Sequence, residues 1–182
     1  MPGSTVPFGL PYPLPADPTS AQAIQDLAEA ADTQVGVVAA QVEAARTYPS
    51  VYVTGGVQPT ASGVLTQMVF NAEVFDEGDM ADLIAFPNSI VIPQAGGYVV
   101  IGQAGLAANA TGDRHVEIRA NGLTIDYVNS PTVTAAGFPY QEQIGVITLF
   151  APGDRLSLHV RQNSGTSVNV AQCFLAAWKI TN

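Results

Sequence analysis

Hydrophobic and polar residues alternate along several short segments in the second half of the chain. Over residues 115–120 and 156–161, apolar side chains occupy the even positions and polar side chains the odd positions. A period of two is typical of half-buried antiparallel strands, and Asn121-Gly122 is a favoured hairpin turn. The pattern predicts an all-β domain with a short strand near 50–54 and further strands at about 64–71, 88–93, 97–107, 114–120, 122–128, 143–151, 154–162 and 168–180.

Some of these expected strands are apolar on both faces. Tyr98 and Val100 point one way in an extended chain while Val99 and Ile101 point the other way. One face of such a strand fills the domain core, and the other face needs a second cover. We therefore expect an oligomer interface, with the core or interface positions Tyr98, Val100, Phe150, Phe174 and Trp178.

Residues 20–46 form the one expected helix, beginning at Ser20 as N-cap and ending before Pro49. Its apolar positions from Ile24 to Ala45 recur with a mean step near 3.5, which favours a short coiled coil. The alternative is an amphipathic helix that lies on the chain's own β-domain. Residues 47–63 contain Gly, Gly and Pro and are interpreted as a linker, which leaves residues 64–182 as the head domain.

The first 19 residues carry six prolines, which forbid a helix and favour an extended chain. Apolar residues alternate with these prolines, and a purely solvated tail is usually more polar. One interpretation is a disordered tail. The other is an extended arm that docks on a partner through Phe8, Leu10, Tyr12 and Leu14.

Composition narrows the class of protein. Charged residues make up 12% of the chain and hydrophobic residues 47%, and this charge content is well below the usual share and favours an assembled protein. A net charge of −9 without a basic patch argues against nucleic-acid binding. The single cysteine, Cys173, excludes an intrachain disulfide framework. We see no secretion signal and no segment long enough for membrane insertion, so we expect no secretory route.

Catalytic motifs are not visible in the sequence. His115 and His159 lie on the polar side of alternating strands, and neither belongs to a recognisable nucleophile–base pair or zinc motif. We expect no enzyme and no cofactor. One acidic segment offers a weak Ca²⁺ candidate, because close carboxylates on a loop can bind this ion, although a solvated acidic loop is the simpler interpretation. Its carboxylates are Asp76, Glu77, Asp79 and Asp82.

Residues 64–181 resemble the C1q/TNF-like jelly-roll domains. The similarity lies in the order and spacing of short motifs at 75–80, 87–93, 96–100, 108–114, 117–122, 149–156 and 174–178. The resemblance implies a jelly-roll sandwich that forms a homotrimer about an apolar threefold axis. Collagen-like repeats, frequent in the stalks of this family, are absent, so residues 20–46 would serve as a trimeric stalk.

The N-terminus resembles the minor tail and fibre proteins of phages that infect actinobacteria. The similar residues are 9–13, 17–18 and 23–28. This resemblance implies a virion structural protein that is assembled in the host cytoplasm and attached to a capsid or tail protein through residues 1–19. Its head would contact a host-surface glycan or protein, or only decorate the particle. The alternative is a bacterial C1q-like binding module outside any phage.

Overall fold

The computed structural model describes residues 20–46, 48–130 and 140–181. The chain divides into two compact units, Met1–Thr47 and Tyr48–Asn182. In the first unit the described element is α1 (Ser20–Arg46), which has the bounds that the sequence predicted. Several of its apolar side chains are exposed within this single chain: Ile24, Leu27, Val35, Val37 and Val38. No helix in the described ranges is long and apolar enough to cross a bilayer.

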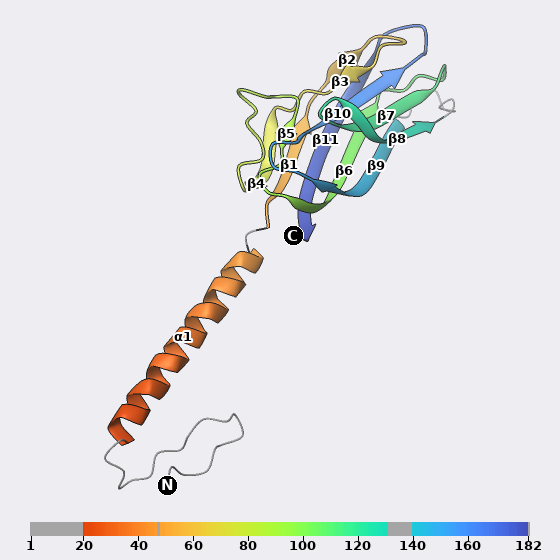
Figure 1. Cartoon of the computed structure of the whole chain (residues 1–182). Coiled ribbons are helices and arrows are strands. Elements are labelled where there is room, and N and C mark those ends of the chain that lie inside the picture. The colour runs from red at the N-terminus through yellow and green to blue at the C-terminus, as the bar shows by residue number, and fades with distance from the viewer. Residues whose placement is uncertain (1–19, 47, 131–139, 182) are drawn as a thin grey trace. The chain divides into compact units, whose positions relative to one another are not determined.

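The second unit is a β-sandwich, called the sandwich below. Its strands are β1 (Ser50–Gly55), β2 (Gln58–Thr60), β3 (Thr66–Gln67), β4 (Ala72–Glu77), β5 (Ile90–Val91), β6 (Gly96–Leu106), β7 (Arg114–Ala120), β8 (Leu123–Ser130), β9 (Tyr140–Phe150), β10 (Arg155–Gln162) and β11 (Val168–Thr181). One sheet has six strands, ordered β4-β1-β11-β6-β9 with β2 also paired to β11. The other has five, ordered β3-β10-β7-β8 with β5 also paired to β10. All of these pairs are antiparallel, and Figure 1 shows the two layers.

The hydrophobic core lies between the two sheets. The alternation seen in the sequence explains it, because alternate side chains along most of the strands point inward. Val116 and Ile118 of β7 and Leu158 of β10 are fully buried. Tyr98 and Val100 of β6 meet them from the six-stranded sheet as members of the same buried cluster. The predicted all-β class is therefore confirmed.

Two tight turns follow from glycine chemistry. Asn121 and Gly122 both adopt positive φ, 52° and 80°, as the two-residue turn between β7 and β8 requires. Gly153 has a φ of 89° in the turn between β9 and β10. The hairpin predicted at Asn121-Gly122 is present, whereas the turn at Gly153 connects strands of the two different sheets.

The boundary of the sandwich differs from the predicted one. Residues 47–63 are not a plain linker, because β1 pairs with β11 and β4, and β2 pairs with β11. Val51 and Val53 of β1 are fully buried in the core. The sandwich therefore begins at Tyr48, not at residue 64. Only the short β3 lies within the strand predicted at 64–71, and β4 was not predicted.

Candidate interaction surface

The outer face of the six-stranded sheet is largely apolar. Strand register aligns its side chains in rows across the sheet. One row contains Phe75, Tyr52, Ala176 and Ile101. The next contains Trp178, Val99 and Ile147. We call this surface the apolar face and define it by these seven residues with Phe174, Leu149 and Ile180.

Aromatic rings dominate one part of the apolar face. The Tyr52 ring lies 5.2 Å from that of Phe174 in an edge-on arrangement and 6.1 Å from that of Phe75. Together with Trp178 and Ile101 they line an open hollow of about 250 Å³. Rings arranged in this way leave an uneven apolar surface, into which the side chains of a second apolar surface can pack.

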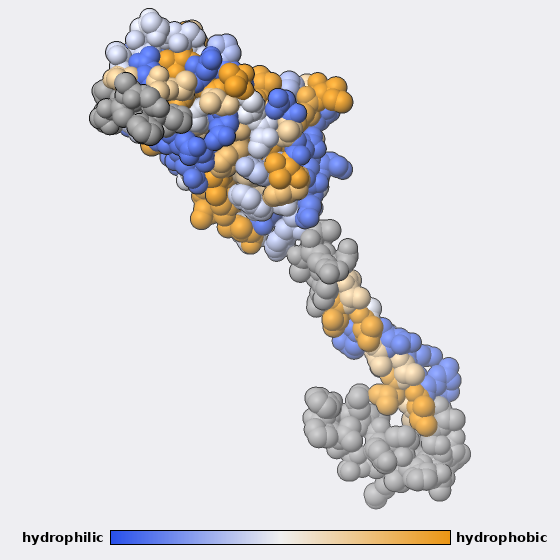
Figure 2. Space-filling view, turned by 180° about the vertical axis from the view of Figure 1, so that it is seen from behind, coloured by the Kyte–Doolittle hydropathy of each residue, from blue (hydrophilic) through white to orange (hydrophobic). Residues whose placement is uncertain are grey.

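Large apolar side chains on this face remain accessible in the single chain. Ile147 and Leu149 of β9 are 71% and 76% exposed, and Ile180 of β11 is 47% exposed. Apolar areas also interrupt the hydrophilic surface of the sandwich in Figure 2. Exposed apolar side chains gathered on one sheet face are typical of an interaction site, whereas scattered ones are ordinary.

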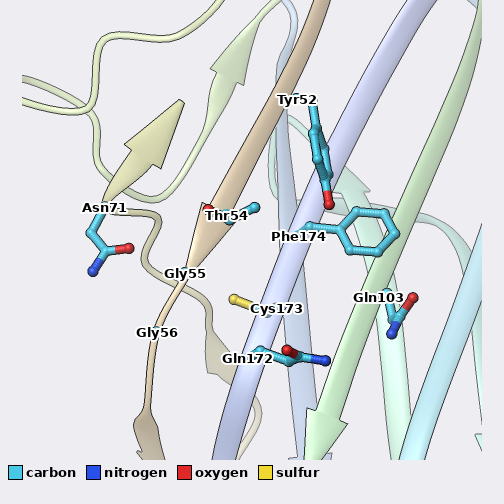
Figure 3. Close-up of a pocket in the computed structure, with 9 residues that line it drawn as sticks. All are labelled: Tyr52, Thr54, Gly55, Gly56, Asn71, Gln103, Gln172, Cys173 and Phe174. Atoms are coloured by element: carbon cyan, nitrogen blue, oxygen red, sulfur yellow. The ribbon is translucent and has the colours of Figure 1, made fainter. Parts of the chain in front are cut away.

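The opposite end of the same sheet face is polar. A hollow of about 410 Å³ is lined there by Tyr52, Phe174, Gln103, Gln172 and other residues of β1 and β11. Figure 3 shows the two rings beside each other, with the amide side chains of Gln103 and Gln172 close by. The sheet face thus changes from aliphatic to aromatic to amide along its strands, which would give a packed partner a defined register.

Cys173 lines this polar hollow but is a poor nucleophile. Burial raises the pKa of its thiol to about 11, although the Gly55 backbone and the Gln58 amide oppose the shift. The Gln58 side chain donates to its Sγ at 3.6 Å. A thiol that stays protonated at neutral pH is a weak nucleophile, and the buried Cys173 packs as a small hydrophobic residue.

Two carboxylates of the acidic segment, the weak Ca²⁺ candidate of the sequence, accept hydrogen bonds from the backbone. Asp76 accepts backbone N–H bonds from Met80 and Ala81, one at each carboxylate oxygen, at 2.9 and 2.8 Å. Asp82 accepts two more from the turn that follows it. Glu77 and Asp79 do not complete a group with them, and no cluster of three acidic, His or Cys side chains suited to a metal occurs among the described residues. Asp76 and Asp82 instead hold the backbone turns of this segment.

The outer face of the five-stranded sheet carries a charged network. Glu117 is only 5% exposed, because His115, Arg119 and Thr124 surround its carboxylate. Burial alone would raise its pKa, but hydrogen bonds and charges from His115 and Arg119 outweigh burial and hold the pKa below the usual value. The network is a compact ion-pair cluster on a sheet face, not a catalytic dyad in a cleft.

Ser157 and His159 lie within hydrogen-bond distance of each other, although the sequence showed no recognisable nucleophile–base pair. Ser157 Oγ is 3.1 Å from His159 Nε2, because residues two apart on β10 project from the same face. Burial, and then the charge of Arg119, lowers the pKa of His159, while Glu117 opposes this shift. The Glu117 carboxylate is engaged by other donors, and within residues 20–46, 48–130 and 140–181 no third group orients the imidazole as in a hydrolase triad.

The structure separates the five predicted core or interface positions into two groups. Tyr98, Val100 and Phe150 are buried between the sheets, and the Tyr98 and Phe150 rings lie 6.0 Å apart. Phe174 and Trp178 are half-buried on the apolar face. The predicted anchor residues Phe8, Leu10, Tyr12 and Leu14 lie outside the described residues.

Comparisons with known proteins place the fold. The globular domain of a zebrafish complement 1qA protein aligns with a TM-score of 0.53 and 11% identity over 74% of this chain and 99% of that domain. Murine APRIL aligns with a TM-score of 0.56 and 15% identity over 73% of this chain and 99% of its own. No model of a known protein family matches, and neither does any curated protein. The sandwich therefore has a C1q/TNF-like fold.

Proposed function

We propose that this chain is a non-enzymatic C1q-like head module that forms a homotrimer through the apolar face. The observation that carries the proposal is the continuous row pattern of Trp178, Val99 and Ile147 beside the aromatic rings of Tyr52 and Phe174. One side of the six-stranded sheet already fills the core, and the exposed apolar side chains of the other side make it the surface for a partner. The C1q/TNF-like fold favours a second and third copy of the same chain as that partner.

The composition supports the same proposal. A monomeric surface normally carries more charge than the 12% found here. Obligate interfaces bury on the order of 2,000 Å² or more and resemble a domain core cut in half. The apolar face carries Ile, Leu, Val, Phe, Tyr and Trp side chains, as such an interface does.

The finer role that we propose is a structural component of a phage virion. Its support is the likeness of residues 9–13, 17–18 and 23–28 to phage tail and fibre proteins, together with the apolar residues between the N-terminal prolines. In this role residues 1–19 attach the protein to a capsid or tail protein, α1 forms a trimeric stalk, and the sandwich contacts the host surface or decorates the particle. The second candidate, a bacterial C1q-like binding module, uses the same trimer without the particle.

Light scattering on matched variants tests the trimer. Leu149 on the apolar face and Leu123 on β8 are similarly exposed, at 76% and 74%. The wild type should have the mass of three 18.9-kDa chains, about 57 kDa. Leu149→Lys should release monomers, because a buried lysine at the interface is costly, and Leu123→Lys should leave the mass unchanged. A folded wild-type monomer, or equal effects of both variants, contradicts the proposal.

The virion role has a separate test. Mass spectrometry of purified phage particles should detect the protein in stoichiometric amount. A variant lacking residues 1–19 should still fold and assemble but should be missing from particles. Normal incorporation of this variant would place attachment elsewhere in the chain, and absence of the wild-type protein from particles would leave the bacterial binding module.

A further inference from the structure

A small polar hollow lies on the outer side of the five-stranded sheet, away from the apolar face. Its volume is about 240 Å³. Ser157, His159 and Arg155 of β10 form one side, and Asn121 of the β7–β8 turn and Asn88 from the segment before β5 lie around it. Strand alternation on β10 explains the first three, since residues two apart share a face.

Arg155 is the one charged side chain that lines the hollow. Its guanidinium carbon lies 3.8 Å from the centroid of the Phe86 ring in a cation–π contact, and its N–H groups make no hydrogen bond within the described residues. Among the described residues it makes no ion pair. The protein has a net charge of −9, yet no carboxylate lines this hollow. Its one charged lining side chain is an arginine without an ion-pair partner.

The neighbouring acid does not neutralise this arginine by direct pairing. Asp154 accepts the side-chain N–H of Asn121 at 2.7 Å and the backbone N–H of Ala151 at 2.8 Å, one at each oxygen. Asn121 in turn accepts the backbone N–H of Arg155 at 2.9 Å. These bonds hold the Asp154 carboxylate within the turn and fix the backbone from which Arg155 projects.

The other lining groups are neutral hydrogen-bonding groups. Gln67 donates its amide to the backbone carbonyl of Asn88 at 3.0 Å, so its own carbonyl oxygen remains an acceptor. The side-chain amide of Asn88 has no hydrogen-bond partner within the described ranges. With the Ser157 hydroxyl and the His159 imidazole they offer both donors and acceptors around a single fixed cation.

We propose that this hollow binds a carboxylate-bearing sugar residue of the uronic acid class. One guanidinium matches a carboxylate through two parallel hydrogen bonds, whereas a phosphate dianion would favour a second cation. The amide and hydroxyl groups match sugar hydroxyls. The volume is below the roughly 300–1,000 Å³ of pockets for drug-sized ligands, so the hollow fits one sugar ring. The site lies on the sheet opposite the proposed trimer interface and does not depend on it.

Calorimetric titration of the full chain with D-glucuronate tests this site. D-glucose, acetate and inorganic phosphate serve as comparison ligands. Arg155→Gln should weaken glucuronate binding about tenfold or more, the usual effect of losing hydrogen bonds to a charged group. Arg161→Gln is the matched control, because Arg161 lies on the same strand, is 43% exposed and faces Asp113 at 3.8 Å. It changes the net charge equally and should leave binding within about twofold.

A second variant keeps the arginine in place. Asn88→Asp introduces a carboxylate of nearly the same shape into the hollow and should weaken glucuronate binding by repulsion. Glucose should bind more weakly than glucuronate. Four results would overturn the proposal: no heat with glucuronate, equal losses in both arginine variants, glucose binding as tightly as glucuronate, or acetate or phosphate binding as tightly as glucuronate.

Discussion

Glu117 is a carboxylate that burial and two cationic partners control together. Because its pKa is lowered in the folded chain, the folded state binds fewer protons than the unfolded state near and below pH 4.5. Its contribution to stability is therefore full above the unfolded pKa and is lost as the pH falls through the folded pKa. Glu117→Gln should lower the free energy of unfolding at pH 7 by about 1.5–3 kcal/mol, the value of hydrogen bonds to a charged group.

Urea denaturation at pH 7 and pH 3.5 measures this effect. The difference in unfolding free energy between wild type and Glu117→Gln should shrink at the lower pH. There the Glu117 carboxylate of the unfolded wild type takes up a proton, which favours the unfolded state. Glu73→Gln is the control, since Glu73 lies exposed on β4. If the difference stays constant between the two pH values, the charge of Glu117 does not stabilise the fold.

Phe150 and Trp178 are aromatic residues from the same prediction with different roles. Phe150 is 8% exposed and lies in the core, whereas Trp178 is half-buried on the apolar face. Phe150→Ala should cost about 3–5 kcal/mol at every protein concentration. Trp178→Ala should cost an amount that grows as the protein is diluted, because it weakens association. Chemical denaturation at two protein concentrations separates them, and equal dilution effects would contradict this assignment.

At the scale of elements, the alternation in the sequence predicted most strands but not every face. In the sequence of β11, Val168, Val170, Phe174, Trp178 and Ile180 share one parity, and Leu175 and Ala177 have the other. In the structure Val168 and Val170 are buried, and the register then shifts, so that Leu175 and Ala177 point inward instead. A β-bulge inserts one residue and exchanges the two faces. No residue type near Val170 marks this bulge in the sequence, so the face of Trp178 could not be read from parity.

The shortest strands lie inside longer predicted ones, β3 within 64–71 and β5 within 88–93. Strands of two residues are too short for alternation to define their bounds. Strand β4 carries acidic residues that are usual in loops, and its pairing with β1 overrides that preference. The hollow beside Arg155 joins residues from β3, β10 and two turns, so only the folded topology brings them together.

Two neighbouring valines of the helix α1 should respond differently to the same substitution. Val38 belongs to the apolar seam expected for a coiled coil, and Val37 lies beside it, with exposures of 55% and 46% in the single chain. Val38→Asp should lower the melting temperature of the helix, since each buried valine contributes roughly 1.5–3 kcal/mol, while Val37→Asp should have little effect. Circular dichroism at 222 nm follows the helix, and fluorescence of the single tryptophan follows the sandwich. Loss of the sandwich signal in Val38→Asp would contradict separate units.

For the whole molecule, the low charge content and the six-stranded sheet with two apolar faces have one common explanation. A sandwich of this size can bury one face of each sheet by itself. In the proposed trimer the apolar face of the six-stranded sheet is covered by other chains, while the five-stranded sheet keeps a polar exterior with Glu117, Arg119 and Arg155. Assembly through one sheet and recognition through the other would divide the two tasks between the layers.

The position where the sandwich begins gives the last prediction. A protein truncated to residues 48–182 keeps β1, whose Val51 and Val53 fill the core, and keeps the 3.0 Å hydrogen bond from Lys179 N–H to the Pro49 carbonyl. It should fold and assemble as the full chain does. Truncation to 64–182, the boundary that the sequence suggested, removes β1 and β2 and leaves one edge of β11 unpaired. This shorter protein should aggregate or melt at a much lower temperature, because an open edge and an uncovered core invite pairing with other chains. Thermal melts and light scattering on both truncations decide the matter, and equal stability of the two would mean that β1 is not part of the folding unit.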